Sequence, residues 1–343
     1  MTMGTWPARL ALGLTLLLTA ACGQLGGPDR IAQGDPGGGI GGTGGAAQPV
    51  RQVGVLGTVR GFGSVQVNGV TVAANGDFEV GSPFGPRRLD ALAEGHVVEI
   101  SARAQGTRLD AQRIAQLVAL AGPVGAVSPN ARRLSAMGVT VELADDAQVA
   151  VDGGLAGLSR GDRVAVSGLW RDGGVVASRI DPLGGRLSAG DGPAAGAVVS
   201  GVIRATDAGP RIGPLSVARA DGGDLPDDRF AVLKGSYRDG RFVAREVETG
   251  HPVLPATLDR LSVEAYAGEV HGQPALHGFG HAVARGTRLE RLLGRRAVFI
   301  GPLANDFLIE HGVPLPDGLA AQRDALQAIG DGLQPQSGVI ETR

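Results

Sequence analysis

Four similar segments of roughly 60 to 75 residues follow one another between Gly54 and Val313, and this repetition restricts the fold more than any other property of the sequence. In each segment, short runs of alternating apolar and polar residues are separated by glycine-rich turns, of which Asn68-Gly69 is the clearest. Alternation with a period of two is typical of β-strands, and an Asn-Gly pair between two such runs predicts a hairpin. The spacing favours small barrels over a solenoid, whose repeats are about 20 to 50 residues long.

A second shared element is an L-x-x-L-x-x-G turn in the middle of the segment. Its residues are Leu89, Leu92 and Gly95 in the first segment and Leu155, Leu158 and Gly161 in the second. The third segment lacks the turn, and the fourth has a version of it that ends at Gly294. A formal match to the G-x-S-x-G nucleophile motif at Ser159 lies inside the second turn, so we do not predict a catalytic serine.

The composition agrees with a protein of short strands and tight turns. There are 58 glycines and 20 prolines, and 43% of the residues are hydrophobic, but only 3% are aromatic. Each unit must therefore build its core from aliphatic side chains. Cores of about 60 residues are marginal on their own, so we expect neighbouring units to pack against one another.

We therefore predict an all-β protein of tandem small antiparallel β-barrel units with short helical turns. The predicted boundaries are a signal peptide at 1–22, a Gly-rich tether at 23–52, barrel units at 53–120, 121–182 and 197–250, a linker at 183–196, a divergent fourth unit at 258–315, and a C-terminal helix and tail at 316–343. Pro316 and Gly330 are the start and stop signals of that helix. We expect it to cap the fourth unit, with partner binding as the alternative.

The N-terminus indicates export and a lipid anchor. Arg9 precedes an apolar stretch, Leu10 to Leu18, which is too short to span a bilayer and has the length of a signal h-region. The small residues before Cys22 resemble a bacterial lipobox, in which the cysteine is lipidated, so Cys22 is the predicted lipid attachment site. Cleavage after Ala21 by ordinary signal peptidase is the alternative.

Two further properties limit the location and the partners. Cys22 is the only cysteine, which excludes disulfides within the chain. Gly23 follows it, which indicates the outer membrane if the cell is Gram-negative. The formal net charge is −2 and the basic residues are spread along the chain, so the sequence does not resemble a nucleic-acid-binding protein.

Several of these motifs together resemble one bacterial family of secreted proteins and lipoproteins, the domain of unknown function numbered five-six-six-six. The resemblance covers most of residues 37–250, and it rests on the Gly-Gly-Ile-Gly-Gly-Thr-Gly tether, Gly61-Phe-Gly63-Ser-Val65, Val67-Asn-Gly69-Val70, Gly161-Asp162-Arg163-Val164 and Ala177-Ser-Arg179-Ile180. It implies tandem OB-like barrels on an exported protein. It supplies no catalytic or ligand-binding residues.

Histidines are concentrated in the last third of the chain, where they form a candidate metal site. His277 and His281 are four residues apart and fall on one face of an extended strand, because side chains alternate along a strand. With His271 they offer imidazole ligands for zinc or copper. The alternative is that they are exposed loop histidines without a ligand, and we predict no other cofactor.

A set of arginines in the fourth unit repeats at nearly helical spacing. Thr287 and Glu290 form a capping box, which predicts a short helix with Arg288, Arg291 and Arg295 on it. Such a helix face contacts anionic lipid or glycan, or it is simply a solvated surface over the barrel.

The sequence thus predicts a non-catalytic cell-envelope lipoprotein whose barrels bind or scaffold another envelope component. The scarcity of aromatic residues favours a protein partner over a glycan and places nucleic acid last, because strand-binding barrels use aromatic platforms. A metal-binding or enzymatic role of the histidine-rich fourth unit is the alternative. The oligomeric state is not predicted.

Overall fold

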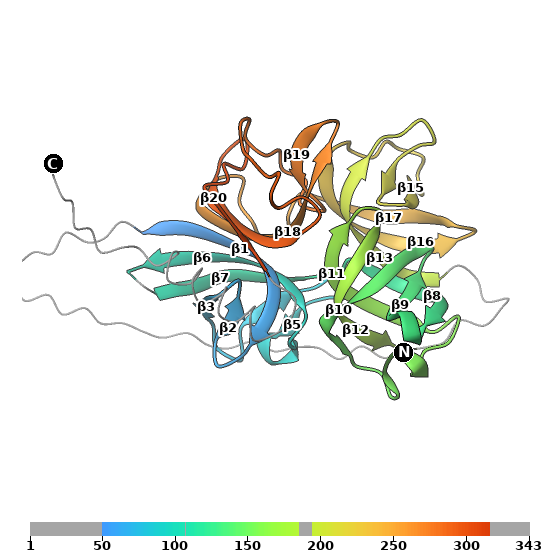
Figure 1. Cartoon of the computed structure of the whole chain (residues 1–343). Coiled ribbons are helices and arrows are strands. Elements are labelled where there is room, and N and C mark those ends of the chain that lie inside the picture. The colour runs from blue at the N-terminus through green and yellow to red at the C-terminus, as the bar shows by residue number, and fades with distance from the viewer. Residues whose placement is uncertain (1–49, 107, 185–193, 316–343) are drawn as a thin grey trace, which may run out of the picture. The chain divides into compact units, whose positions relative to one another are not determined.

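The computed structural model describes residues 50–106, 108–184 and 194–315 (Figure 1). These residues form β-strands and three short 3₁₀ helices, Leu89–Ala91, Pro129–Ala131 and Gly154–Gly157. The prediction of an all-β fold with short helical turns is therefore confirmed. The predicted signal peptide, Cys22, nearly all of the tether, most of the linker and the C-terminal helix lie outside the described residues.

The first barrel is a closed ring of five strands. These are β1 (Arg51–Gly61), β2 (Val65–Val67), β3 (Val70–Ala73), β6 (Val97–Gln105) and β7 (Arg108–Leu117). Strand β1 pairs with both β2 and β6, and β7 pairs with both β6 and β3, which closes the ring. A small hairpin, β4 (Glu79–Gly81) with β5 (Arg87–Arg88), extends the sheet beyond β7.

The second barrel repeats this order of pairing. Its strands are β8 (Leu120–Ser128), β9 (Arg133–Ala136), β10 (Val139–Val149), β11 (Arg163–Arg171) and β12 (Gly174–Leu183). Three consecutive strands are followed by a fourth that pairs with the first, which is a Greek key, and the fifth closes the ring between the fourth and the third.

The third segment closes in the same way although its sequence lacks the central turn. Its strands are β13 (Ala194–Arg204), β14 (Arg211–Ile212), β15 (Leu215–Arg219), β16 (Arg229–Arg238) and β17 (Arg241–Thr249). The pairings reproduce those of the second barrel one by one. The ring therefore does not depend on that turn.

The barrels are not fully antiparallel, and this corrects one detail of the prediction. In each barrel the third and fifth strands run parallel: β3 with β7, β10 with β12, and β15 with β17. A closed ring with an odd number of strands cannot alternate direction all the way round. One parallel pair is thus a geometric requirement of closure with five strands.

The fourth unit, here called the terminal unit, is an open arrangement in the described residues. Its strands are β18 (Leu258–Val270), β19 (Gln273–Leu276), β20 (Arg296–Leu303) and β21 (His311–Pro314). They pair in the order β19-β18-β20-β21, and no pairing of these named strands closes a ring. The unit instead pairs with the first barrel through β18.

The predicted turns form as the residue types require. Asn68 and Gly69 join β2 to β3 with φ angles of 53° and 78°, the conformation of a two-residue type I′ hairpin. In the L-x-x-L-x-x-G turns the leucines of both segments are buried, and Gly95 and Gly161 have positive φ. Both predicted turn types are therefore present.

The predicted basic helix after Thr287 is wrong. Residues 287–295 form consecutive turns, with backbone hydrogen bonds from Leu292 to Leu289 and from Arg295 to Leu292. The Gly294 backbone donates to Ala267 on β18 instead of continuing a helix. Pairing with the sheet thus overrides a local helical pattern bounded by two glycines.

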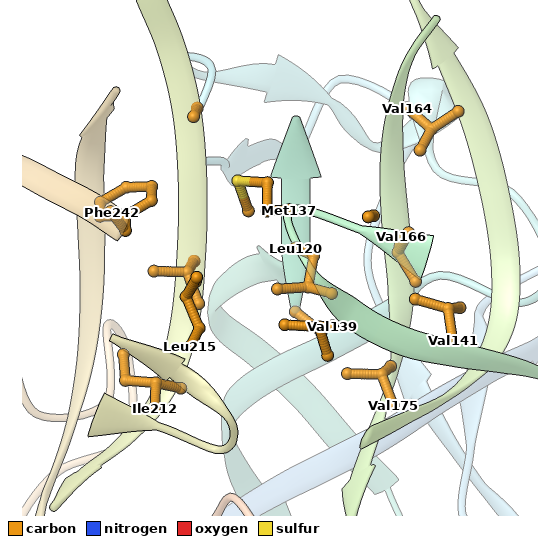
Figure 2. Close-up of a cluster of buried hydrophobic side chains, with 14 of the residues drawn as sticks. Leu120, Met137, Val139, Val141, Val164, Val166, Val175, Ile212, Leu215 and Phe242 are labelled. Atoms are coloured by element: carbon orange, nitrogen blue, oxygen red, sulfur yellow. The ribbon is translucent and has the colours of Figure 1, made fainter. Parts of the chain in front are cut away.

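The barrel interiors are mainly aliphatic, as the composition predicted. Figure 2 shows valines, Leu120 and Met137 of the second barrel beside Ile212, Leu215 and Phe242 of the third. These side chains belong to one buried cluster that spans both barrels. The first barrel has its own cluster of valines, leucines and isoleucines.

The four units pack against one another through shared strands and a central apolar cluster. Strand β1 pairs parallel with β18, and β8 pairs with β13 (Figure 1). The central cluster combines Leu56, Leu169, Val198 and Phe299, one from each unit. Neighbouring units thus supply the burial that a small barrel lacks on its own.

A buried ion network also joins the first barrel, the second barrel and the terminal unit. Glu264 on β18 accepts hydrogen bonds from the Thr58 backbone N and from Arg296 Nε, both at 2.7 Å. Arg60 on β1 pairs with Asp146 on β10 and lies 3.5 Å from Glu264. The side chains of Glu264 and Asp146 are only 2% and 5% exposed. The ion pairs that join the three units are therefore shielded from water.

Candidate functional site

Two contiguous cavities lie where the second barrel, the third barrel and the terminal unit meet, and together we call them the junction cleft. Their volumes are about 190 and 900 Å³. They share the lining residues Val202, Arg204, Val270 and Leu276, which makes them one continuous space. Ligand cavities commonly have about 300 to 1,000 Å³ and occur between domains, so the cleft has the size and place of a binding site.

Trp170, at the end of β11, forms the inner wall of the smaller cavity. Its indole Nε1 donates a 2.7 Å hydrogen bond to the Ser200 carbonyl of the third barrel. The ring packs against Gly213 and Gly278, where an added Cβ would come within 2.4 and 2.9 Å of it. Both glycines also have positive φ. The half-buried ring of one barrel thus fits between glycines of two other units.

Three arginines line the smaller cavity, and their partners differ. Arg171 pairs with Glu142 and lies over the Tyr266 ring. Arg204 pairs with Asp228. Arg211 has a buried Nε with no hydrogen-bond partner within the part of the chain that the structure describes. One guanidinium of the cleft thus has an Nε that no described residue accepts from.

The histidines of the predicted metal site all line the junction cleft, but they do not converge. His277 Nε2 lies 3.0 Å from Asp172 Oδ1, although the atoms are not aligned for a hydrogen bond. His281 lines the larger cavity, and so does His271, which occupies the β18–β19 turn with a φ of 52°. Across residues 50–106, 108–184 and 194–315, no three His, Cys, Asp or Glu side chains are grouped to hold a metal ion.

His251 behind the cleft was not singled out from the sequence. Its Nδ1 bonds Glu99, and its Nε2 donates to the Phe279 carbonyl at 2.7 Å. Both partners are acceptors, so the ring needs a proton on each nitrogen and is cationic. Burial opposes that charge, but the charge and hydrogen bond of Glu99 and the Phe279 carbonyl raise the pKa of His251. Glu99 is 152 residues away from His251 in the chain, so no local sequence pattern predicts that the two side chains pair.

Burial and the neighbouring His251 together keep His281 neutral. The two rings stack at a centroid distance of 5.3 Å, and Phe230 covers the other face of His251 at 4.4 Å. Burial, the charge of His251 and that of Arg229 lower the pKa of His281 to about 4. Burial also lowers the pKa of His277, with Arg204 acting in the same direction against Asp172. Both histidines thus present neutral rings to the cleft at neutral pH, each with one donor and one acceptor.

Comparison with known proteins identifies part of the chain. Residues 53–115 and 121–181 each match the family model described as domain of unknown function (DUF5666). These two segments are DUF5666 domains. The resemblance predicted from the motifs is confirmed for them, in tandem. No curated protein and no solved structure matches the chain.

The two DUF5666 domains correspond to the first and second barrels. The second domain contributes Trp170 and Asp172 to the junction cleft, whereas Arg204, Arg211 and the cleft histidines lie outside the matched residues. One wall of the cleft therefore comes from a DUF5666 domain and the others from the third barrel and the terminal unit.

The described residues were also compared with the requirements of a membrane span. Among them there is no helix that is long and apolar enough to cross a bilayer.

Proposed function

We propose that the chain is a non-catalytic, lipid-anchored cell-envelope protein that binds another envelope component in the junction cleft. The observation that carries the proposal is the cleft itself, a cavity between three units with unmet hydrogen-bonding capacity in its walls. Anchoring through Cys22 and location in the outer membrane are the parts of the proposal that rest on the sequence alone.

The proposal treats the three barrels as OB-like. Closed five-stranded Greek-key barrels of this kind bind oligosaccharides and oligonucleotides with the loops between strands 1 and 2 and between strands 4 and 5. Here Thr206 comes from the loop between the first and second strands of the third barrel. Asp172 and Gly173 form the loop between the fourth and fifth strands of the second barrel. Two of the loops that line the cleft, one from each barrel, therefore correspond in position to ligand-binding loops of OB-folds.

Filling the cleft is expected to remove binding. Ala275 is half-buried and lines the larger cavity, so Ala275→Trp places a large ring in it. Affinity capture from detergent-solubilised envelope is expected to recover the bound component with the wild type, and about tenfold less of it with Ala275→Trp, because the new ring occupies space that the ligand needs; a tenfold loss corresponds to about 1.4 kcal/mol.

The matched control is Ala131→Trp, on an exposed 3₁₀ turn of the second barrel outside the cleft, which is expected to capture as well as the wild type. Equal recovery with Ala275→Trp overturns the cleft as the binding site. Recovery of no specific protein, glycan or lipid with any of the three proteins overturns the binding role.

The anchor is tested separately at Cys22. Cells that express the full chain are expected to incorporate a fatty-acid probe into the wild type and to retain it in the membrane fraction. Cys22→Ser removes the acylated thiol and is expected to lose both the label and the membrane retention. An unlabelled wild type cleaved after Ala21 contradicts the anchor and supports ordinary secretion.

A further inference from the structure

Two arginines of the junction cleft face each other directly across a pair of strands. Arg204 on β13 and Arg211 on β14 are register partners in an antiparallel pair, and both line the smaller cavity. Like charges directly opposite each other destabilise a sheet. The arrangement therefore works against the stability of the third barrel unless an anion lies between or beside the two side chains.

Among the described residues, a carboxylate pairs with one member of this pair. Arg204 forms an ion pair with Asp228, whereas no carboxylate of the described residues pairs with Arg211. The Nε of Arg211 is buried and without a hydrogen-bond partner there. The charge that Arg211 brings to the cavity therefore has no counter-ion among the described residues, and an oxyanion in the cavity would supply one.

We propose that the Arg204–Arg211 pair binds a carboxylate of an acidic oligosaccharide in the junction cleft; this rests on the proposed function and names the ligand class of that site. A guanidinium binds a carboxylate with two parallel hydrogen bonds, and both arginines of the pair line the cavity. The scarcity of aromatic residues in the sequence favoured a protein partner. The charged and polar side chains that line the cleft favour an acidic sugar more strongly.

The remaining walls suit the hydroxyl groups of a sugar. Neutral His277 and His281 each offer a donor and an acceptor, and Asp172, Thr206 and Gln273 add further polar groups. The binding space is a cavity between units. Typical protein partners instead bury an extended surface of about 1,200 to 2,000 Å². The volume of the larger cavity leaves room for several sugar rings beyond the one on the arginines.

The test is calorimetric titration of the full chain with tetragalacturonate, an acidic sugar, and with maltotetraose, a neutral one of the same length. Tetragalacturonate is expected to bind at least about tenfold more tightly than maltotetraose, because only the acidic sugar forms charged hydrogen bonds with the arginines. Arg211→Gln is expected to abolish this preference. It is also expected to raise the thermal midpoint of the unliganded protein, since it removes a like-charge pair and an unsatisfied buried donor.

Arg241→Gln is the matched control. Arg241 is the register partner of Arg238 in the same barrel, and Arg238 pairs with Asp239, just as Arg204 pairs with Asp228. This second pair is at an exposed hairpin and does not line the cleft. Arg241→Gln is therefore expected to leave the affinity for tetragalacturonate unchanged.

The remaining outcomes overturn the inference in distinguishable ways. If Arg211→Gln lowers the thermal midpoint, or keeps the preference for tetragalacturonate, Arg211 is a structural residue. If tetraglutamate binds as tightly as tetragalacturonate, the ligand class is an acidic peptide. If neither sugar binds while capture from the envelope still depends on Ala275, the ligand assignment fails and the proposed function stands. If capture fails as well, both fail.

Discussion

Replacing Trp170 with alanine is expected to lower the free energy of unfolding by about 3 kcal/mol, at the lower end of the range for large aromatic side chains because the ring is half-buried. The variant loses ring contacts with glycines of the third barrel and the terminal unit, and it leaves the buried Ser200 carbonyl without the indole N–H. Urea unfolding followed by far-ultraviolet circular dichroism measures the change.

A double-mutant cycle with Gly213→Ala separates ring packing from a general loss of stability. In the wild type the new methyl group meets the Trp170 ring at 2.4 Å, so Gly213→Ala is expected to cost about 1 to 3 kcal/mol. In the Trp170→Ala background the overlap is absent, and only the strain of a positive φ remains, about 1 kcal/mol. Additive effects of the two substitutions contradict the packing account.

Phe84→Ala is the control for Trp170→Ala. Phe84 is an aromatic residue of the first barrel that is 37% exposed, so its loss is expected to change the free energy of unfolding by less than about 1 kcal/mol. A loss below about 1 kcal/mol for Trp170→Ala as well would mean that the three units around the cleft are held by other contacts. The shape of the junction cleft is also expected to change when Trp170 is replaced, because the ring forms the inner wall of the smaller cavity.

The elements that follow local rules could be predicted from the sequence. The Asn68-Gly69 hairpin depends on two adjacent residues that tolerate positive φ, and the turn of Leu89, Leu92 and Gly95 depends on leucines that point into the barrel. Alternation along a strand indicates which side chains are buried but not which strand lies beside it. The parallel pair that closes each ring was therefore missed, although five-strand closure requires it.

The features that depend on distant residues could not be predicted. The cleft forms because Trp170, Arg211 and His281 come from three different units, and nothing in their local sequences connects them. The histidine pattern pointed to the terminal unit, and the structure places these histidines along the cleft. It did not reveal that His281 stacks on His251, a ring whose charge is fixed by Glu99 in the first barrel.

The buried ion network could not be predicted either, because no local sequence pattern indicates which residues form it. Glu264 lies in an apolar strand between Val263 and Ala265, where a carboxylate is unfavourable unless it is paired. Burial alone would raise its pKa. The charges of Arg296 and Arg60, with the Thr58 hydrogen bonds, lower the pKa below its ordinary value of 4.5. The carboxylate is therefore ionised at neutral pH and stabilises the fold in that form.

Glu264→Gln is expected to lower the free energy of unfolding by about 3 kcal/mol at neutral pH, because it keeps the shape but leaves buried guanidinium groups without their carboxylate. Glu310→Gln is the control, since Glu310 pairs with Arg260 on the same strand β18 but is 39% exposed, and it is expected to change the free energy by less than about 1 kcal/mol. Equal effects of the two substitutions contradict a role for the buried network.

The pH dependence gives an independent measurement of the same carboxylate. A group whose pKa is lower in the folded state adds stability above its unfolded pKa, and this stability is lost as the pH falls through the folded pKa. The difference in unfolding free energy between the wild type and Glu264→Gln is therefore expected to be largest above about pH 4.5 and to shrink in more acidic solution. A difference that stays constant down to the acid limit of folding contradicts the ionised carboxylate of Glu264 as its source.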